Sequence, residues 1–313
     1  MKKTLLTIAS ILIIAAITFV LAFPSKIPEE SNTSVDVYFC PRDNCSHHLY
    51  AALEASQEPK CAFYDINLDE IKAALDGKKL VMDDKNKIKG ARSDNGQALM
   101  HNKFCILDNG LLTGSFNPTA RGNTMNNNNL VVIHSNLLKK PYEDEFDELW
   151  GGYFGGGKKA RQNEVILDGS LYEAYFCPED GCEERLIKAI NSANSSIHFM
   201  VFSFTSRKVA DALISAANAV EVKGVMESSQ NSKFSQYSHL KSNNIDVNLD
   251  ANKANMHHKV FIIDDLVVTG SYNPTQNGNK YNDENVLVIH DRDIADEFEN
   301  EFSLVLGQSL GSS

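Results

Sequence analysis

The chain carries the same polar motif twice. MHNKFCILDNGLLTGSFNPTARGN runs from Met100 to Asn123, and MHHKVFIIDDLVVTGSYNPTQNGN runs from Met256 to Asn279. A duplicated fold needs similar apolar positions in its two copies, but it does not need identical histidine, lysine, aspartate, serine and asparagine residues. The repeat therefore predicts two copies of one structural unit, each contributing half of a chemical site.

Strand-like and helix-like segments alternate around both motifs. In the second copy, IHFMVFSF, VEVKGVM and NVLVIH predict strands, whereas EERLIKAINSANSS, SRKVADALISAANA and IADEFENEFSLVL predict amphipathic helices. The first copy repeats the pattern with VDVYF, KFCILD and NLVVIH, and it ends in the helical segment YEDEFDELW. We therefore expect an α/β fold with two similar α/β/α sandwich halves and mixed sheets. Aromatic residues around the motifs are expected to lie in the core.

The repeat also sets the expected domain boundaries. The first half is predicted at residues 35–150 and the second at residues 165–313, with a linker at residues 151–164. This linker contains GGYFGGGKK, which lacks the preceding strand and following helix of a phosphate-binding loop. The second half has an additional helix-like stretch, SKFSQYSHLKSNN, ahead of its motif.

The N-terminus predicts a targeting segment. Lys2 and Lys3 precede an uncharged apolar run of 19 residues from Leu5 to Phe23. A signal peptide has an apolar region of about 7–15 residues, and a membrane-spanning helix needs about 20. Residues 1–23 are therefore expected to be a signal anchor, or a signal peptide if they are cleaved, and residues 24–34 a linker. The lysines place the N-terminus in the cytoplasm, so the catalytic domain is expected outside it, either membrane-anchored or secreted.

Four of the six cysteines form two closely spaced pairs. CPRDNC holds Cys40 and Cys45, and CPEDGC holds Cys177 and Cys182. In an oxidising compartment each pair predicts a short-loop disulfide. Zinc is disfavoured, because the histidines that follow the first pair have no counterpart after the second.

The other two cysteines are expected to be buried core positions. Cys105 lies within the first motif, and Phe261 occupies the matching place in the second. This exchange indicates an apolar position and not a reactive thiol. Cys61 opens an apolar strand and is expected in the core as well.

Each motif offers an imidazole, an ammonium, a hydroxyl and a carboxamide. His101 and Lys103 are two residues apart, as are His257 and Lys259, so each pair shares one face of a strand. The hydroxyl and amide side chains after each motif have the same spacing: Ser115, Asn117, Ser271 and Asn273.

This combination suits a phosphodiester. Lysines and asparagines can bind its non-bridging oxygens, and two histidines can divide the roles of nucleophile and acid. No cluster with metal-ligand spacing accompanies the motifs, so neither a metal nor a cofactor is expected.

The pattern HxKxxxxD, present twice and each time followed by GSxN, resembles the phospholipase D superfamily. The resemblance covers roughly residue 35 to the C-terminal helix. It implies two α/β halves around a two-fold-like axis with one active site between them, and therefore a monomer with an internal pseudo-dimer. It also implies a phosphohistidine intermediate and no metal. The residues to which it assigns the catalytic positions are His101, Lys103, Asp108, His257, Lys259, Asp264 and Glu284, of which the two aspartates are expected to be supporting residues.

One carboxylate breaks the repeat. Glu284 precedes Asn285 in the second copy, and Asn128 occupies the equivalent position in the first. The resemblance implies that a residue here orients a catalytic histidine. If each orients the histidine of its own copy, His257 beside the carboxylate holds its proton better and serves as the acid, and His101 is the better neutral nucleophile.

These observations predict a phosphodiesterase of the phospholipase D type. The turn sequence GSxNxT is closest to the small endonuclease-like branch and favours a nucleic-acid substrate. A glycerophospholipid is the alternative, because a membrane anchor would bring the enzyme close to lipid. The net charge of −11 argues against a broad surface for polyanions, so phosphate recognition is expected to be local. A non-catalytic phosphate-binding protein is a remote alternative, since neither motif copy is lost.

Overall fold

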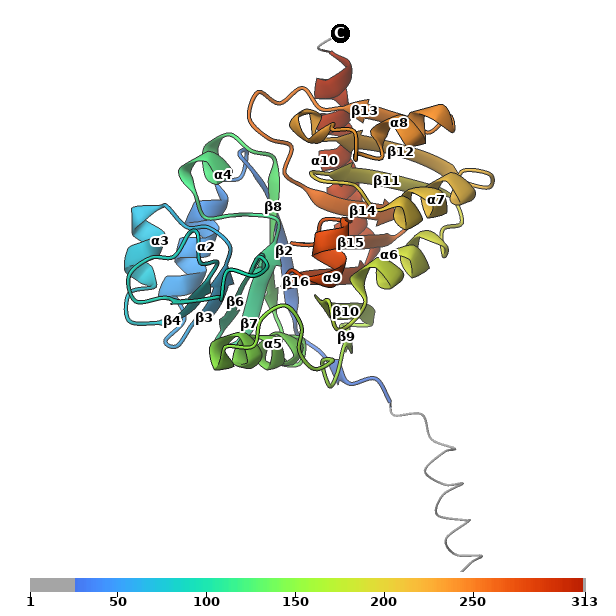
Figure 1. Cartoon of the computed structure of the whole chain (residues 1–313). Helices are drawn as coiled ribbons and strands as arrows, with labels where there is room; N and C mark the ends of the chain where they lie inside the picture. The colour runs from blue at the N-terminus through green and yellow to red at the C-terminus, as the bar shows by residue number, and fades with distance from the viewer. Residues whose placement is uncertain (1–25, 312–313) are drawn as a thin grey trace, which may run out of the picture.

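The computed structural model describes residues 26–311, which form two halves that are each built on one β-sheet (Figure 1). The predicted hydrophobic helix at residues 1–23 lies outside the described residues. Within residues 26–311, no helix is long and apolar enough to span a membrane. The anchor therefore stays a prediction.

The sheet of the first half has seven strands and mixed pairing. β3, β4 and β5 run parallel, and the remaining neighbours are antiparallel. In spatial order the strands are β2 (Ser34–Cys40), β8 (Asn128–His134), β7 (Gly110–Gly114), β6 (Lys103–Leu107), β3 (Lys60–Phe63), β4 (Lys79–Met82) and β5 (Arg92–Ser93).

The sheet of the second half has nine strands, seven of which repeat the order of the first sheet. The repeated strands are β10 (Ser170–Cys177), β16 (Glu284–His290), β15 (Leu266–Gly270), β14 (Lys259–Ile263), β11 (Ser196–Val201), β12 (Glu221–Met226) and β13 (Asp246–Leu249). Two more strands extend its edge, β9 (Glu164–Leu167) and β1 (Glu29–Glu30). β1 falls within the expected linker at residues 24–34, so this part of the segment is a strand and not a free connection.

Helices cover both faces of each sheet, as expected for sandwich halves. The outer face of the first sheet carries α2 (Cys45–Glu54) and α3 (Asp69–Ala74), and its inner face carries α5 (Lys139–Gly151). The outer face of the second sheet carries α6 (Cys182–Ile190), α7 (Arg207–Ala216) and α8 (Tyr237–Ser242), and its inner face carries α10 (Arg292–Leu310). Three short helices remain: α4 (Ala120–Thr124), α9 (Gln276–Lys280) and the 3₁₀ helix η1 (Ser228–Gln230).

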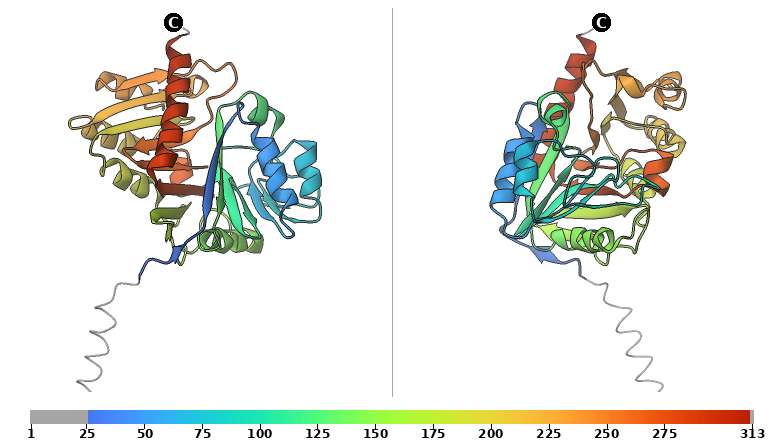
Figure 2. Two further views of the ribbon diagram at one scale, coloured as in Figure 1. Left: turned by 180° about the vertical axis from the view of Figure 1, so that it is seen from behind. Right: turned by 60° about the vertical axis from the view of Figure 1, so that its left-hand side comes forward.

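A single hydrophobic core joins the two halves. It combines inward-facing strand residues of both sheets with α5 and α10 side chains such as Tyr142, Phe146, Phe298 and Phe302. Seen from behind, α10 runs as a long helix between the halves (Figure 2), and it contacts β2 of the first half as well as its own sheet. Buried apolar contacts therefore fix the junction at which the two motifs lie.

The glycine of each GSxN turn is required by a close backbone approach. Gly114 ends β7 and Gly270 ends β15, with φ angles of 138° and 132°. A Cβ at Gly114 would lie 2.5 Å from the carbonyl oxygen of Asn129, and one at Gly270 would lie 2.4 Å from that of Asn285. Any side chain would push the turn off the neighbouring strand, which explains glycine in both copies.

All six cysteines form disulfides. The two predicted short-loop bonds are present, Cys40–Cys45 and Cys177–Cys182. The third bond, Cys61–Cys105, joins β3 to β6. The expectation that these two cysteines are buried is confirmed, but it missed their bond, because only the strand register shows that they are direct cross-strand partners.

Candidate active site

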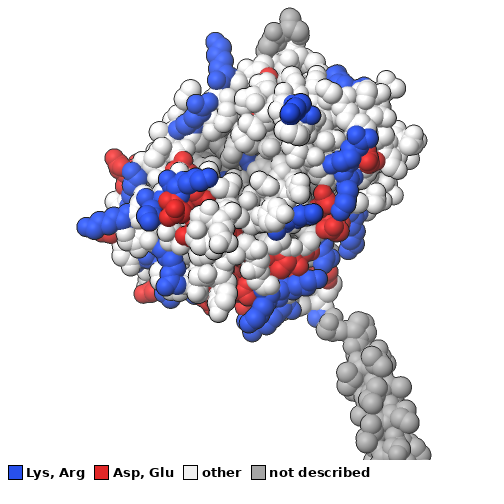
Figure 3. All heavy atoms as spheres, in the orientation of Figure 1, with Lys and Arg blue, Asp and Glu red and all other residues white. Residues whose placement is uncertain are grey.

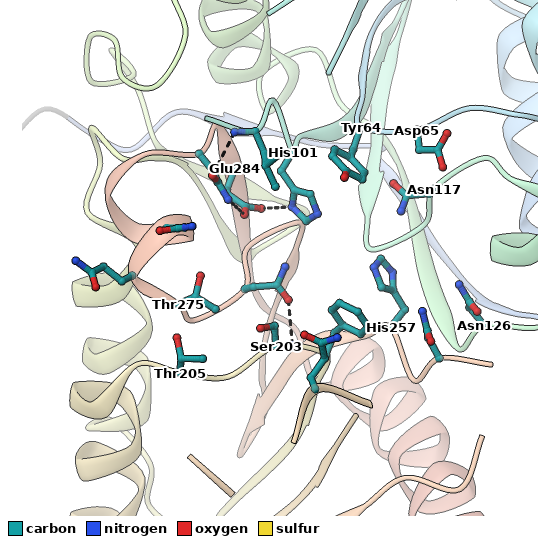
Figure 4. Close-up of a pocket in the computed structure, with 18 of the residues that line it drawn as sticks. Tyr64, Asp65, His101, Asn117, Asn126, Ser203, Thr205, His257, Thr275 and Glu284 are labelled. Carbon is teal, nitrogen blue, oxygen red and sulfur yellow. Dashed lines mark hydrogen bonds and ion pairs between the residues drawn. The ribbon is translucent and has the colours of Figure 1, made fainter. Parts of the chain in front are cut away.

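The two motif histidines meet at the junction between the halves, just before the strands that begin at the lysines. The backbone N–H of His101 donates to the carbonyl of Asp283 in the second half, and that of His257 donates to the carbonyl of Asn127 in the first half, both at 2.9 Å. The two imidazoles face the same cavity (Figure 4). The structure therefore brings the two motif copies together at one place.

Each histidine is oriented by a side chain from the other half. His101 Nδ1 lies 2.7 Å from Glu284 Oε2, and His257 Nδ1 lies 2.8 Å from Asn128 Oδ1. The expectation that each histidine is held by its own copy is therefore wrong. The reason is the backbone pairing across the junction, which places the first residue of β16 beside His101 and the first residue of β8 beside His257.

These contacts determine which imidazole nitrogen is available for chemistry. Asn128 Nδ2 donates to the carbonyl of Gly122 at 2.9 Å, so its Oδ1 is the atom that faces His257. Because an amide oxygen only accepts, His257 Nδ1 must carry a proton, and Nε2 is the free nitrogen. His101 Nδ1 likewise donates to Glu284 when the carboxylate is ionised, which leaves Nε2 free in the other half-site.

The two lysines are buried next to the motif histidines, and neither is among the residues that line the cavity. Lys103 and Lys259 are 1% and 3% exposed. Each ammonium donates to the carbonyl of the motif histidine that precedes it, at 2.7 and 2.8 Å. The Nζ of Lys103 also lies 5.3 Å from the ring centre of Tyr64, and that of Lys259 lies 4.9 Å from the ring centre of Phe202. These contacts hold the two lysine side chains beside the motif histidines.

Burial dominates the titration of this group. It lowers the pKa of both histidines well below the usual value, and the lysines add to the effect. Burial also lowers the pKa of Lys103 to about 7 and that of Lys259 well below its usual value, and it raises the pKa of Glu284 to about 8. A phosphate anion between the lysines would offset both their desolvation and their mutual repulsion, so the electrostatics favour anion binding.

The asparagines of the two turns reach the cavity. Asn117 and Asn273 both line it. Asn273 Oδ1 accepts a hydrogen bond from the backbone N–H of Ser203 at 3.3 Å, whereas Asn117 Oδ1 is buried and has no hydrogen-bond partner among the described residues. Their position fits the predicted contact with phosphate oxygens.

The serines of the same turns do not reach the cavity. Ser115 and Ser271 are fully buried, and each hydroxyl accepts a hydrogen bond from a backbone N–H of the neighbouring strand, that of Asn129 at 3.0 Å and that of Asn285 at 2.9 Å. Ser271 also donates to Glu284 at 2.9 Å. In this structure Ser271 positions Glu284, and Ser115 holds the strand that carries Asn128, which differs from the predicted contact with phosphate.

The motif aspartates lie at the opposite ends of their strands, away from the cavity. Asp108 accepts hydrogen bonds from Ser56 Oγ and from the backbone N–H groups of residues 57 and 58. Asp264 accepts from the backbone N–H groups of residues 194–196. Both fix the loop that precedes a strand. Their position supports the expected supporting role, and a direct part in the reaction does not fit it.

The cavity between the histidines has a volume of about 1230 Å³. More than half of its lining residues are asparagine, glutamine, serine or threonine, contributed by both halves, such as Asn117, Asn126, Thr205 and Thr275 (Figure 4). Figure 3 shows basic side chains around the hollowed face, with acidic side chains among them. The cavity thus offers many neutral hydrogen-bonding groups and few charged ones.

Sequence reasoning missed two aromatic residues of the site. Tyr64 packs edge-on against His101 with ring centres 4.9 Å apart, and Phe202 packs in the same way against His257 at 4.7 Å. Both line the cavity, so the expectation that such residues lie in the core is wrong for these two. The sequence could have indicated them, because Tyr64 in CAFYDIN and Phe202 in IHFMVFSF each directly follow the equivalent strand, β3 and β11.

A further part of the wall comes from the segment that only the second half contains. Gln230, Lys233, Phe234 and Gln236 line the cavity next to η1. Phe234 is 66% exposed, and the ammonium of Lys233 lies 5.0 Å from its ring centre. The additional stretch noted in the sequence therefore makes the cavity asymmetric.

Known proteins share this sequence pattern and this fold. Residues 67–150 and 186–306 match the family described as cardiolipin synthase, PLD-like domain. The chain belongs to the phospholipase D superfamily. Like its relatives in that superfamily, it is a hydrolase that acts on phosphodiester bonds.

Individual members of the phospholipase D superfamily resemble this chain over shares of different size. A phospholipase D from Rickettsia prowazekii is 36% identical over 141 residues, which cover 44% of this chain and 69% of that protein. A mitochondrial cardiolipin hydrolase from Xenopus tropicalis is 32% identical over 132 residues, which cover 40% of this chain and 63% of that protein. The crystal structure of phosphatidylserine synthase from Haemophilus influenzae covers 85% of both chains with a TM-score of 0.60 and 10% identity, and it shows the fold alone.

Proposed function

We propose that this phospholipase D superfamily member hydrolyses phosphodiester bonds of nucleic acids through a covalent phosphohistidine. The observation that carries the proposal is the polar cavity between the halves. Two imidazoles face this cavity, and each is bound by a side chain from the other half. Lysine ammonium groups supply the positive charge for the phosphate, so the reaction uses no cofactor.

The reaction has two displacements at phosphorus. In the first, His101 Nε2 attacks, the bond to the leaving oxygen breaks, and protonated His257 gives its Nε2 proton to that oxygen. In the second, water attacks the phosphohistidine, His257 accepts a proton from the water, and the bond between phosphorus and His101 breaks. Asn117 and Asn273 bind the non-bridging oxygens, with the charges of the two lysines beneath.

Each histidine is held by a residue of the other half, and this arrangement still supports His101 as the nucleophile and His257 as the acid. A histidine that is phosphorylated on Nε2 and protonated on Nδ1 is a cation, and the buried carboxylate of Glu284 stabilises that charge on His101. His257 donates instead to the neutral amide of Asn128, which stabilises its cation less. His257 is therefore the stronger acid and the better proton donor to the leaving oxygen.

The lining of the cavity favours nucleic acid as the substrate. Amide and hydroxyl side chains can bind sugars, phosphates and base edges, and the rings of Tyr64, Phe202 and Phe234 offer flat faces for bases. Acyl chains need a continuous apolar surface, and Leu99 is the only aliphatic residue among those that line the cavity.

A glycerophospholipid remains the second candidate, because two observations favour it. Similar proteins are named phospholipase D and mitochondrial cardiolipin hydrolase. In addition, Met125, Phe234 and Tyr281 are exposed apolar side chains that line the cavity or directly precede a residue that does. Such side chains could enter a lipid surface while the headgroup occupies the polar cavity.

The deciding experiment offers both substrates to the full-length chain in mild detergent. One arm contains end-labelled single-stranded DNA, and the other contains mixed micelles of cardiolipin or phosphatidylglycerol. We expect DNA fragments, no comparable release of lipid products, and no cleavage by His257→Ala. Lipid hydrolysis without DNA cleavage would replace the proposed substrate with the second candidate.

We also propose that the chain is a monomer, anchored in a membrane or secreted, with its catalytic part outside the cytoplasm. The apolar run at residues 5–23 and the three disulfides support this placement. One chain contains both half-sites, so a second copy is not needed. Membrane fractionation, alkylation of free thiols and light scattering test these points. Six free thiols in protein from its native source would contradict export.

A further inference from the structure

The two halves meet at two equivalent contacts, and one of them contains an ion pair. Glu301 of α10 is buried and accepts a hydrogen bond from Arg42 Nη1 at 2.9 Å. Its other oxygen lies 3.2 Å from His258 Nε2. A buried carboxylate is costly without compensating charge, and here Arg42 from the first half supplies a full positive charge.

The second of the two contacts has a carboxylate at the position that Arg42 occupies in the first. Glu145 of α5 occupies the place of Glu301 in the repeat, and Glu179 of CPEDGC occupies the place of Arg42 in CPRDNC. Glu145 is also buried, but its hydrogen-bond partner is the neutral amide of Asn102, at 2.9 Å. Among the described residues, no lysine or arginine forms an ion pair with Glu145 or Glu179.

Further carboxylates face the same spot. Oxygen atoms of Glu145, Glu148 and Glu179 lie within 4.8 Å of one another. Asp283 is 4% exposed; its Oδ1 accepts from the backbone N–H of Gly155 at 2.7 Å, but its Oδ2 is buried and has no partner among the described residues. Glu179 Oε2 is also without a partner there.

Asp283 lies near these three glutamates and interacts electrostatically with two of them. Its pKa is raised to about 8 by burial and by the nearby charge of Glu179, and its own charge raises the pKa of Glu145. The linker encloses the group, since Gly155 binds Asp283 and the backbone N–H of Lys158 donates to Glu148 at 3.1–3.2 Å. Three carboxylates thus lie together, with Asp283 nearby, at the place where the other contact holds a cation.

We propose that this carboxylate cluster, Glu145, Glu148 and Glu179 with Asp283 beside it, binds one divalent cation that joins the two halves as Arg42 does at the equivalent contact. Carboxylate oxygens without histidine or cysteine ligands select hard cations. Ca²⁺ fits best, because it accepts irregular arrangements of six to eight oxygens, whereas Mg²⁺ demands near-ideal octahedral geometry. The cation stabilises the junction and takes no part in the reaction at the histidines.

The test compares the melting temperature of the full-length chain, first freed of metal with EGTA, in the presence of CaCl₂, MgCl₂ or neither. A ligand that binds only the folded state at about a hundredfold excess over its Kd should raise Tm by about 5 °C. We expect this rise with CaCl₂, a smaller one with MgCl₂, and direct calcium binding with a stoichiometry near one in titration calorimetry.

Glu179→Arg introduces an arginine at the position equivalent to Arg42, and it is the decisive variant. It should melt at or above the temperature of the calcium-loaded wild type and should not respond to calcium. Glu179→Gln should bind calcium at least tenfold more weakly, which provides a second measurement if the arginine variant does not fold. Glu184→Arg changes an exposed acid of α6 outside the cluster and should keep the full response.

Two outcomes would overturn the proposal. No calcium response in the wild type, together with a higher Tm on mild acidification, would mean that the carboxylates hold protons in place of a cation. An undiminished response in Glu179→Arg would place any calcium elsewhere. Room-temperature turnover of a nitrophenyl phosphodiester should be equal with and without EGTA, which separates this site from the catalytic one.

Discussion

Replacing Glu284 with glutamine tests the crossed arrangement of the active site. Glu284 is fully buried and lies 2.7 Å from His101 Nδ1, although it belongs to the second half. Glutamine keeps the size and an accepting oxygen but cannot carry the negative charge that Glu284 has above its pKa of about 8. A hydrogen bond to a charged partner contributes about 1.5–3 kcal/mol, so above that pH phosphorylation of His101 should slow by about 10- to 150-fold.

The assay uses two substrates that differ in their leaving groups. A nitrophenyl phosphodiester needs little protonation of its leaving oxygen, whereas a dinucleotide needs it. The loss in Glu284→Gln should persist with both substrates, because the variant impairs the attack by His101. Asn128→Ala disturbs His257 instead, so its loss should be large with the dinucleotide and small with the nitrophenyl ester.

The opposite pattern would refute the reasoning. If Glu284→Gln reacts normally with the nitrophenyl ester and Asn128→Ala does not, His257 is the nucleophile. Mass spectrometry provides an independent check, because phosphohistidine survives an alkaline quench. His257→Ala should accumulate the adduct on His101 with the nitrophenyl substrate, and an adduct on His257 in the unmodified chain would reverse the roles.

Four further outcomes are expected. His101→Ala and His257→Ala should each remove nearly all turnover, and the double variant should be little slower, since residues that act as a unit are not additive; half of the activity in each single variant would mean two independent sites. The value of kcat/KM should fall as pH rises through about 7, because Lys103, with a pKa of about 7, then loses the charge that binds phosphate; a profile that stays flat to alkaline pH would contradict this. Room-temperature turnover should survive EDTA, because lysines supply the charge; a loss that divalent metal restores would exclude the proposed mechanism. Asp108→Ala should lower Tm by a few degrees but leave kcat nearly unchanged, since its partners belong to a distant loop; a large loss of kcat would return Asp108 to the reaction.

Most of the strands could be predicted, whereas several small elements could not. The apolar runs next to the motifs became β6, β7, β8 and their equivalents, and the two terminal amphipathic patterns became α5 and α10. The helices α2 and α3 were not predicted, and α3 has only six residues, which is too short to show a helical period. β1, β5 and β9 were missed as well, because strands of two to four residues depend on the partner with which they pair.

Residue spacing alone determined what each half-site contains. Side chains two apart on a strand share a face, so the histidine and lysine of each motif had to lie together, and the repeat implied a second set. The same local logic predicted Cys40–Cys45 and Cys177–Cys182, whose partners are five residues apart.

Only the tertiary structure decided which groups meet across the junction. His101 and Glu284 are 183 residues apart, and Cys61 and Cys105 are 44 apart. Sequence equivalence suggested that Glu284 contacts the histidine of its own half, but the packing of one half on the other places it beside His101. The physical reason is that local geometry fixes the direction of a side chain within its own element, whereas its partner depends on how the buried faces of two sheets pack together.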